Sequence, residues 1–187
     1  MLNLIVAHCR HRGIGFKNTL PWFIKSDLKR FKHLTIGNGN NAVIMGRKTW
    51  ESLPVKHQPL SNRTNVIISN TLQQSDVNKY ITNCRQSKTI KVVKSIQDAK
   101  KFCIDNKFDD TWVIGGDTIY TQFLKCPDIS YIYITEINNE FNCDAFFSPI
   151  PDYFRYISNS NSVWQLENGL WFKNKVLKNI QMTSCWI

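Results

Sequence analysis

Five short apolar runs, rich in β-branched residues, recur along the first 116 positions, and each ends near a glycine, a serine or a polar residue. They are LIVAHC (4–9), NAVIMG (41–46), NVIIS (65–69), IKVV (90–93) and TWVIGG (111–116). Segments typical of helices follow most of them. Strands that alternate with helices indicate a parallel sheet with crossover connections, so this part of the chain predicts an α/β fold with a buried sheet.

Four segments are predicted to be helices: 24–36, 47–53, 95–106 and 117–125. The third begins with SIQD, which resembles a capping box, and its residues Ile96, Ala99 and Cys103 recur at helical spacing. The stretch IGNGNN (36–41) and the polar run 69–89 are predicted to be surface loops.

The pattern changes after residue 128, where SYIYITEI, YFRYIS and LWFKNKVL follow one another. The last two are separated by the turn-forming letters NSNS and ENG and not by a helix, which favours an antiparallel addition to the sheet. A chain of 187 residues suits one well-filled core. We therefore expect a single α/β domain, with a mixed, mostly parallel sheet of about eight strands, the last antiparallel, and four flanking helices.

Asp27 is the only acidic residue among the first 50, which contain nine Lys and Arg. On a helical wheel with about 100° per residue, Asp27 lies in an apolar arc with Phe31 and Leu34. The basic residues on the opposite side are Lys25, Lys29 and Lys32. A carboxylate in that arc needs a raised pKa, an internal hydrogen bond or a ligand that donates to it. The alternative is that Asp27 merely caps a helix beginning near residue 28.

The formal charge of +10 favours anionic partners: nucleic acid, acidic lipid or a phosphorylated small molecule. Basic residues are spread over the whole chain without a block of Lys and Arg alone, which argues against nucleic acid. No apolar run reaches the roughly 18 residues of a membrane span, and the basic residues of MLNLIVAHCRHRG follow its apolar run, unlike those of a signal peptide.

Six cysteines without a CxxC pair favour reduced thiols and a cytoplasmic location. His8 and Cys9 have side chains of metal-binding type, but adjacent residues of a strand point to opposite faces. We therefore expect no metal site.

Three glycine-containing segments bear on cofactor binding. GIGFKN (13–18) half-resembles a dinucleotide fingerprint, but Asn18 stands at the third glycine position and Pro21 follows, so we expect a flexible loop there. VIMGRKTWESL (43–53) and WVIGGDTIYTQFL (112–124) each place glycine between a strand and a helix, where backbone N–H groups and the helix dipole bind anions. Two such turns in a basic chain favour a phosphorylated cofactor.

Taken together, the segments LIVAHCRHRGIGFKNTLPW, SDLKRFKHLT, VIMGRKTWESL, PLSNRTNVIIS, VIGGDTIYTQFL and YITEI…CDAFF resemble dihydrofolate reductases in order and spacing. The resemblance covers about residues 2–178. It implies hydride transfer from NADPH to dihydrofolate, giving tetrahydrofolate, with methotrexate-like antifolates as further ligands. It also implies a reductase domain over 1–178, with an adenosine-binding subdomain at roughly 38–108, and leaves the tail 179–187 without a role.

The resemblance implies that Asp27 accepts hydrogen bonds from the amino group and ring N–H of the pterin, with Thr135 sharing this network. Leu20, Pro21 and Trp22 resemble the mobile loop that closes over the reacting rings. Residues matching the family's substrate site are Ile5, Val6, Ala7, Asp27, Leu28, Phe31, Leu53, Leu60, Arg63, Ile114 and Thr135. Of these, Arg63 resembles the arginine that binds the α-carboxylate of the folate glutamate.

Residues matching the family's NADPH site are Ala7, Ile14, Gly15, Asn18, Leu20, Gly46, Arg47, Lys48, Thr49, Ser69, Asn70, Lys94, Ile114, Gly115, Gly116, Asp117, Thr118 and Tyr120. Arg47 and Lys48 are the cations expected to favour NADPH over NADH. The sequence departs from the family pattern at Ala145 and Ser148, which bear on the movement of the loop. It departs again at Asn70, where relatives offer a basic or hydroxyl group, and at Asp117, which we expect either to disturb a phosphate turn or to cap the helix 117–125.

The residues leave two alternative functions open. One is a sister enzyme on the same fold, such as a pyrimidine reductase of flavin synthesis, which Asp27 and Arg63 disfavour. The other is a nucleic-acid-binding module, for which the chain lacks an aromatic and basic motif. We expect a monomer. The family also suggests an association with thymidylate synthase or a former fusion to it.

Overall fold

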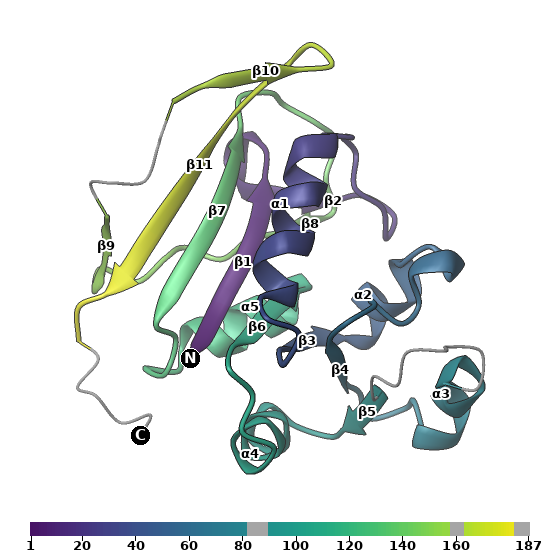
Figure 1. The fold of residues 1–187 in the computed structure, drawn as a ribbon. Coiled ribbons are helices and arrows are strands. Elements are labelled where there is room, and N and C mark those ends of the chain that lie inside the picture. The colour runs from purple at the N-terminus through teal and green to yellow at the C-terminus, as the bar shows by residue number, and fades with distance from the viewer. Residues whose placement is uncertain (82–89, 158–162, 182–187) are drawn as a thin grey trace.

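The computed structural model describes residues 1–81, 90–157 and 163–181. Its central sheet has nine strands in the order β10-β11-β7-β1-β6-β3-β4-β5, with β9 paired to β11. The parallel part consists of β1 (Leu2–His8), β3 (Ala42–Gly46), β4 (Thr64–Ile68), β5 (Ile90–Val93), β6 (Thr111–Gly115) and β7 (Tyr131–Ile137). The antiparallel part consists of β9 (Phe154–Tyr156), β10 (Gln165–Glu167) and β11 (Leu170–Asn179). The expected mixed, mostly parallel sheet with an antiparallel last strand is confirmed (Figure 1).

All four expected helices are confirmed to within one or two residues. They are α1 (Lys25–Ile36), α2 (Arg47–Ser52), α4 (Ile96–Asp105) and α5 (Asp117–Leu124). Two short 3-10 helices, η1 (Arg10–Arg12) and η2 (Val55–His57), lie in loops. The expected start of α4 is also confirmed, because Ser95 is its N-cap and the Ser95 hydroxyl oxygen accepts from the Asp98 N–H at 3.1 Å.

A fifth helix, α3 (Gln74–Ile81), lies in the run 69–89 that was predicted to be a loop, so that prediction was wrong. Tertiary contacts hold this polar helix. The Gln74 side chain donates to the Ile90 carbonyl at 2.9 Å and accepts from the Val92 N–H at 2.9 Å, and Val77 is buried against the sheet. Residues 82–89 of the same run, the NSNS turn and residues 182–187 of the tail lie outside the described residues.

Helices cover both faces of the sheet (Figure 1). On one face, α4 and α5 pack through residues such as Ala99 and Phe123 against Leu4 and Val113. On the other face, α1, α2 and α3 contribute Phe31, Trp50 and Val77 to a cluster with Ile5 and Trp112. Alternate residues of each strand thus enter opposite cores, which explains why the strands are almost wholly apolar.

The carboxyl ends of β1, β3, β4 and β6 lie along the same edge of the sheet, because these strands run parallel. The loop 9–24, helix α2, the segment 69–73 and helix α5 begin at this edge. In open α/β sheets, ligands bind at that edge. Within the ranges that the structure describes, no helix combines the length and apolar composition needed to cross a bilayer.

Candidate active site

Asp27 lies in the first turn of α1, which begins at Lys25 after Ile24. The alternative that Asp27 caps a helix beginning near residue 28 is therefore wrong. Its carboxylate instead faces the sheet, where the Thr135 hydroxyl of β7 donates to Asp27 Oδ1 at 2.5 Å. The basic side chains expected on the outer face, Lys25, Lys29 and Lys32, are exposed.

Burial raises the pKa of Asp27 above its ordinary value. The hydrogen bond from Thr135 and the charge of Arg30 oppose this rise, whereas the charge of Glu167 adds to it. The carboxylate therefore favours a proton or a ligand that donates hydrogen bonds, as the helical wheel indicated.

Glu167, at the end of β10, provides the cap that α1 lacks locally. Its carboxylate accepts from the Lys25 N–H at 2.6 Å and from the Ser26 N–H at 3.2 Å. The Ser26 side chain, followed by these backbone donors, holds the pKa of Glu167 below its ordinary value. A residue 142 positions from Lys25 in sequence thus fixes the helix that carries Asp27, and sequence reasoning missed it because no local pattern marks such a cap.

Removing this cap gives the first testable prediction. Glu167→Ala is expected to speed amide hydrogen exchange at Lys25 and Ser26 by about 5- to 10-fold, because both N–H groups lose their partner. Loss of the negative charge also lowers the pKa of Asp27. Exchange followed by NMR measures the first effect, and a carboxyl titration measures the second. Glu140→Ala, which removes an exposed acid near His11, is the matched control and should change neither.

Five of the residues expected to line the substrate site belong to one apolar cluster: Ile5, Phe31, Leu53, Leu60 and Ile114. Ala7 packs in a neighbouring cluster with Trp22, and Leu28 is 42% exposed. Val6 differs, since its side chain belongs to the core on the other face of the sheet. Only the backbone of Val6 is on the side of the site.

Arg63 is buried, with 3% of its surface exposed. Its guanidinium donates to the Ser61 carbonyl at 3.1 Å and to the Thr35 hydroxyl at 2.5 Å, and it lies over the Phe31 ring. Burial lowers the pKa of Arg63 to about 10, so it stays charged at neutral pH. Among the described residues, no carboxylate forms an ion pair with it, and a buried cation without a counterion is ready for an anionic ligand.

Two glycine turns lie next to each other at the ends of β3 and β6. Helix α2 begins after Gly46 and α5 begins after Gly116, and neither N-cap residue has a capping side chain. First-turn N–H groups can therefore bind a ligand, except the Thr118 N–H, which is bonded to Asp117 Oδ1 at 2.7 Å. A side chain at Gly116 would meet the Thr49 hydroxyl at 3.2 Å, and one at Gly115 (φ +112°) would meet the Tyr120 ring at 2.9 Å. The turns therefore form a close-fitting cradle in which only glycine leaves the backbone accessible.

Tyr120 lies beneath this cradle and not in it. Its side chain is 5% exposed, and its hydroxyl donates to the Ile5 carbonyl at 2.8 Å. Asp117 is the first residue of α5, after the N-cap Gly116, so the expectation that Asp117 is the capping residue was wrong. Its carboxylate accepts from the Thr118 N–H at 2.7 Å, which places a negative charge beside the second turn.

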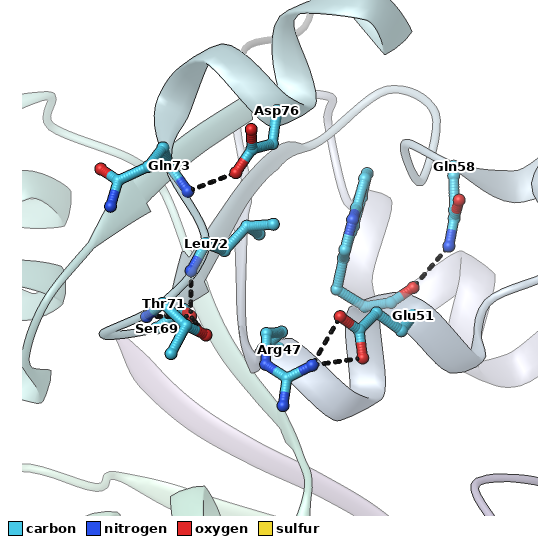
Figure 2. Close-up of polar contacts among 9 residues, drawn as sticks. Arg47, Glu51, Gln58, Ser69, Thr71, Leu72, Gln73 and Asp76 are labelled. Atoms are coloured by element: carbon cyan, nitrogen blue, oxygen red, sulfur yellow. Dashed lines mark hydrogen bonds and ion pairs between the residues drawn. The ribbon is translucent and has the colours of Figure 1, made fainter.

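Figure 2 shows polar contacts of α2 and of the segment that follows β4. Arg47 forms two hydrogen bonds with Glu51, one turn further along α2, at 2.7 and 2.8 Å. The Ser69 hydroxyl accepts from the Leu72 N–H at 2.9 Å, and the Lys94 ammonium donates to the Leu72 carbonyl at 3.4 Å. Asn70 is exposed beside them, and Lys48 is exposed on α2. Sequence reasoning missed Glu51, although its i,i+4 spacing from Arg47 was a usable signal.

The segment GIGFKN forms no helix, but its first three residues form strand β2, so the expectation of a flexible loop was wrong for Gly13–Gly15. Backbone bonds between Phe16 and Thr19 close a tight turn with Asn18 at φ +60°, and β2 (Gly13–Gly15) pairs with β8 (Ala145–Phe146). Asp144 accepts from the Lys17 N–H at 2.9 Å. Ile14 contacts the core beside this pairing.

Two departures from the family pattern lie beside the same loop. Ala145 pairs with Gly15, and the Ser148 hydroxyl lies 2.6 Å from that of Thr121 on α5. At the end of the loop, Leu20 is 53% exposed whereas Trp22 is buried against Phe141. The Trp22 indole N–H has no hydrogen-bond partner among the described residues.

Comparison with known proteins identifies the family of this chain. The family model described as dihydrofolate reductase matches residues 1–178. The chain is 38% identical over 183 residues to the dihydrofolate reductase of Drosophila melanogaster, covering 94% of this chain and 96% of that protein. It is 32% identical over 189 residues to the dihydrofolate reductase of Aedes albopictus, covering 95% and 97%.

A third relative has a different organisation. The chain is 37% identical over 176 residues to bifunctional dihydrofolate reductase-thymidylate synthase 1 of Arabidopsis thaliana, covering 90% of this chain and 32% of that protein. The chain therefore belongs to the dihydrofolate reductase family, and it is an NADPH-dependent oxidoreductase that reduces 7,8-dihydrofolate to 5,6,7,8-tetrahydrofolate for one-carbon metabolism.

Proposed function

We propose that Asp27 and Thr135 hold the pterin ring of dihydrofolate during its reduction. The single observation that carries this assignment is a half-buried carboxylate with a raised pKa, bonded to a threonine hydroxyl and open to the apolar cluster around Ile5 and Phe31. The amino group and a ring N–H of the pterin donate to the carboxylate. These bonds fix the ring and favour protonation of its adjacent nitrogen.

A proton reaches the pterin through water. Among the described residues of the site, Asp27 has no second carboxylate near enough to bond with it, and its nearest acid, Glu167, is occupied by the α1 backbone. The buried Trp22 indole N–H, which has no hydrogen-bond partner among the described residues, is suited to hold a water. Leu20, Pro21 and Trp22 close over the reacting rings and exclude bulk solvent.

The rest of the substrate lies between apolar walls and a cation. Ile5, Leu53, Leu60 and Ile114 contact the rings, with Ala7, Leu28 and Phe31 completing the wall and Val6 contributing backbone only. Arg63 binds the α-carboxylate of the glutamate, because its planar fork matches a carboxylate and no carboxylate among the described residues pairs with its charge.

The residues at the strand edge fit NADPH. Gly46 and Thr49 at one helix start, and Gly115 and Gly116 at the other, present backbone donors and a hydroxyl to the pyrophosphate. The cofactor, when bound, supplies the hydride. The groups that orient the nicotinamide end are Ala7, Ile14, Gly15, Asn18, Leu20, Ile114 and the ring of Tyr120, and those at the second turn include Asp117 and Thr118.

The adenosine end lies on the segment 38–108, which we treat as the adenosine-binding subdomain. Arg47 and Lys48 bind the 2′-phosphate, with Ser69, Asn70 and Lys94 around the adenosine. Arg47 must divide its guanidinium between Glu51 and the phosphate, and its five N–H donors allow both contacts.

This assignment makes a prediction about cofactor choice. Arg47→Ala and Lys48→Ala are each expected to raise the KM for NADPH roughly 10-fold, because one charge-assisted bond to the 2′-phosphate is lost. The KM for NADH, which lacks that phosphate, should change less than about 2-fold by the same reasoning. Steady-state assays with both cofactors measure the ratio. Lys101→Ala on α4, which removes an exposed cation also paired to an acid at i+4, is the matched control. Equal losses with both cofactors would contradict the 2′-phosphate role.

We further propose that the enzyme is a cytoplasmic monomer that also binds antifolates such as methotrexate through Asp27. The described cysteines Cys9, Cys103, Cys126 and Cys143 are free, which suits a reducing compartment. The fused organisation of the Arabidopsis relative supports a former fusion to, or an association with, thymidylate synthase, in which the tail 179–187 would be the point of connection.

A further inference from the structure

Asn174 of β11 lies at the end of a chain of polar groups that begins at Asp27. β11 pairs with β7 so that Asn174 stands opposite Thr135, and β7 pairs with β1 so that Thr135 stands opposite Ala7. The Thr135 hydroxyl oxygen lies 2.5 Å from Asp27 Oδ1 and 3.1 Å from Asn174 Oδ1. Three side chains from α1, β7 and β11 thus meet at one hydroxyl.

The position of Asn174 is otherwise apolar. The neighbouring residues of β11 that point to the same face are Phe172, which is buried, and Val176, which stands opposite Tyr133. A half-buried amide between two apolar side chains costs free energy unless it is hydrogen-bonded. Its bond to Thr135 accounts for an amide at this place in the strand.

The hydrogen of the Thr135 hydroxyl determines which group the Asn174 amide presents to it. A threonine hydroxyl has one hydrogen and cannot donate to two oxygens at once. When Asp27 is ionised, the short bond to its carboxylate takes that hydrogen, so the amide must present its N–H to Thr135. When Asp27 is protonated, the carboxyl can donate to Thr135, which then donates to the amide oxygen. A 180° rotation of the amide, with reorientation of the hydroxyl hydrogen, exchanges the two arrangements without moving other heavy atoms.

We propose that Asn174 is a positioning residue for Asp27 that acts through Thr135, with its amide satisfying the hydroxyl in both protonation states of the carboxyl group. The chain of donors running N–H to O–H to carboxylate strengthens each bond, and bonds to a charged group are the stronger ones. Asn174 therefore stabilises ionised Asp27 more than protonated Asp27 and limits the rise of its pKa.

Other charged groups near Asp27 do not replace this effect. Arg30 on the same helix and Glu167 from β10 act on Asp27 through their charges, in opposite directions. Lys173 and Lys175, the neighbours of Asn174 on β11, point to the other face of the sheet and pair with Glu136 of β7. Trp22 in the loop carries no charge. Asn174 is thus the group from β11 that reaches the pair.

The test is a carbon-13 NMR titration of the aspartate carboxyls in the ligand-free enzyme, with the Asp27 signal assigned by its loss in Asp27→Asn. Asn174→Leu removes the amide at similar volume, and Asn174→Ser leaves a polar group too short to reach Thr135. Both variants are expected to raise the Asp27 midpoint by about 0.5 to 1 pH unit, as expected for one hydrogen bond to an ionised partner. If one of the two variants fails to fold, the other still tests the proposal.

A double-mutant cycle distinguishes an effect of Asn174 that passes through the Thr135 hydroxyl, which we call the relay, from an effect of packing. In a Thr135→Val background the hydroxyl is absent, so Asn174→Leu should move the midpoint by less than about 0.2 pH unit. Val176→Ala changes packing on the same face of β11 and should leave the midpoint unchanged. An unchanged midpoint in both Asn174 variants, or the same shift with and without the Thr135 hydroxyl, would overturn the proposal.

The same variants connect the relay to catalysis, a step that rests on the proposed role of Asp27. The pH midpoint of hydride transfer in Asn174→Leu should rise together with the NMR midpoint. If the NMR midpoint moves and the kinetic one does not, the relay stands and the proposed role of Asp27 fails. The two failures are therefore distinguishable.

Discussion

Asp27→Asn is expected to lower the rate of hydride transfer to dihydrofolate at neutral pH by roughly 10²- to 10⁴-fold, the usual contribution of a positioned acid–base group. An amide keeps the shape of the side chain and one acceptor oxygen. It loses the charge that attracts the two donors of the pterin and that favours a proton on the adjacent nitrogen. Single-turnover stopped-flow measurements isolate this step from product release. A loss below about threefold would exclude the assigned role.

The pH dependence of the same step has a definite sign. The reaction consumes a proton beside Asp27, and burial raises the pKa of this group, with Thr135 and Arg30 limiting the rise. The wild-type rate should fall as pH rises through the midpoint of the Asp27–pterin unit. Asp27→Asn should remove that dependence, leaving a low rate that changes little with pH.

Stability supplies a control for this variant. The folded pKa of Asp27 lies above its unfolded value, so the folded enzyme binds more protons than the unfolded chain between the two values. Its stabilising contribution is fully present below the unfolded pKa and is lost as pH rises through the folded pKa. A neutral amide avoids this loss. The ligand-free variant should therefore have a Tm at neutral pH equal to or above that of the wild type, measured by calorimetry, so its loss of activity cannot be ascribed to unfolding.

The fold was predictable where local pattern and tertiary structure agree. The apolar runs became the parallel strands, and the spacing of Ile96, Ala99 and Cys103 identified α4 because its buried side is apolar. Helix α3 was missed although Val77, Tyr80 and Ile81 stand at helical spacing in the sequence, because the run 69–89 is mostly polar. The bonds of the Gln74 side chain to β5, which hold this helix, could not be seen in the sequence. Asp27 could be found because an acid in an apolar arc conflicts with its surroundings.

The groups that support Asp27 could not be found in the same way. Glu167 and Asn174 reach α1 and Thr135 only because β10 pairs with β11 and β11 pairs with β7. Local sequence contains no information about that pairing. The residues proposed to act directly on the ligand are therefore easier to identify from sequence here than those that hold them in place, because the latter depend on contacts between distant segments.

Arg63→Leu is expected to raise the KM for dihydrofolate roughly 100-fold, because a buried carboxylate–guanidinium pair is lost and the carboxylate remains desolvated. In the ligand-free enzyme the guanidinium bonds only to the neutral Ser61 and Thr35 oxygens among the described residues, so its charge is available to the substrate. The kcat should change less than about threefold, because the glutamate is remote from the reacting ring and is bound equally in the ground and transition states. Steady-state kinetics at saturating NADPH measure both constants.

The substrate provides the matched control for Arg63. Dihydropteroate has the pterin and benzoyl groups but lacks the glutamate, so its KM should be the same for the wild type and Arg63→Leu. Arg63→Lys keeps the charge but not the planar fork, and should lie between the two for dihydrofolate. If the KM for dihydropteroate rose as much as that for dihydrofolate, Arg63 would act by packing over Phe31 and not by binding a carboxylate. The difference between the two substrates thus measures the ion pair separately from the structural contribution of Arg63.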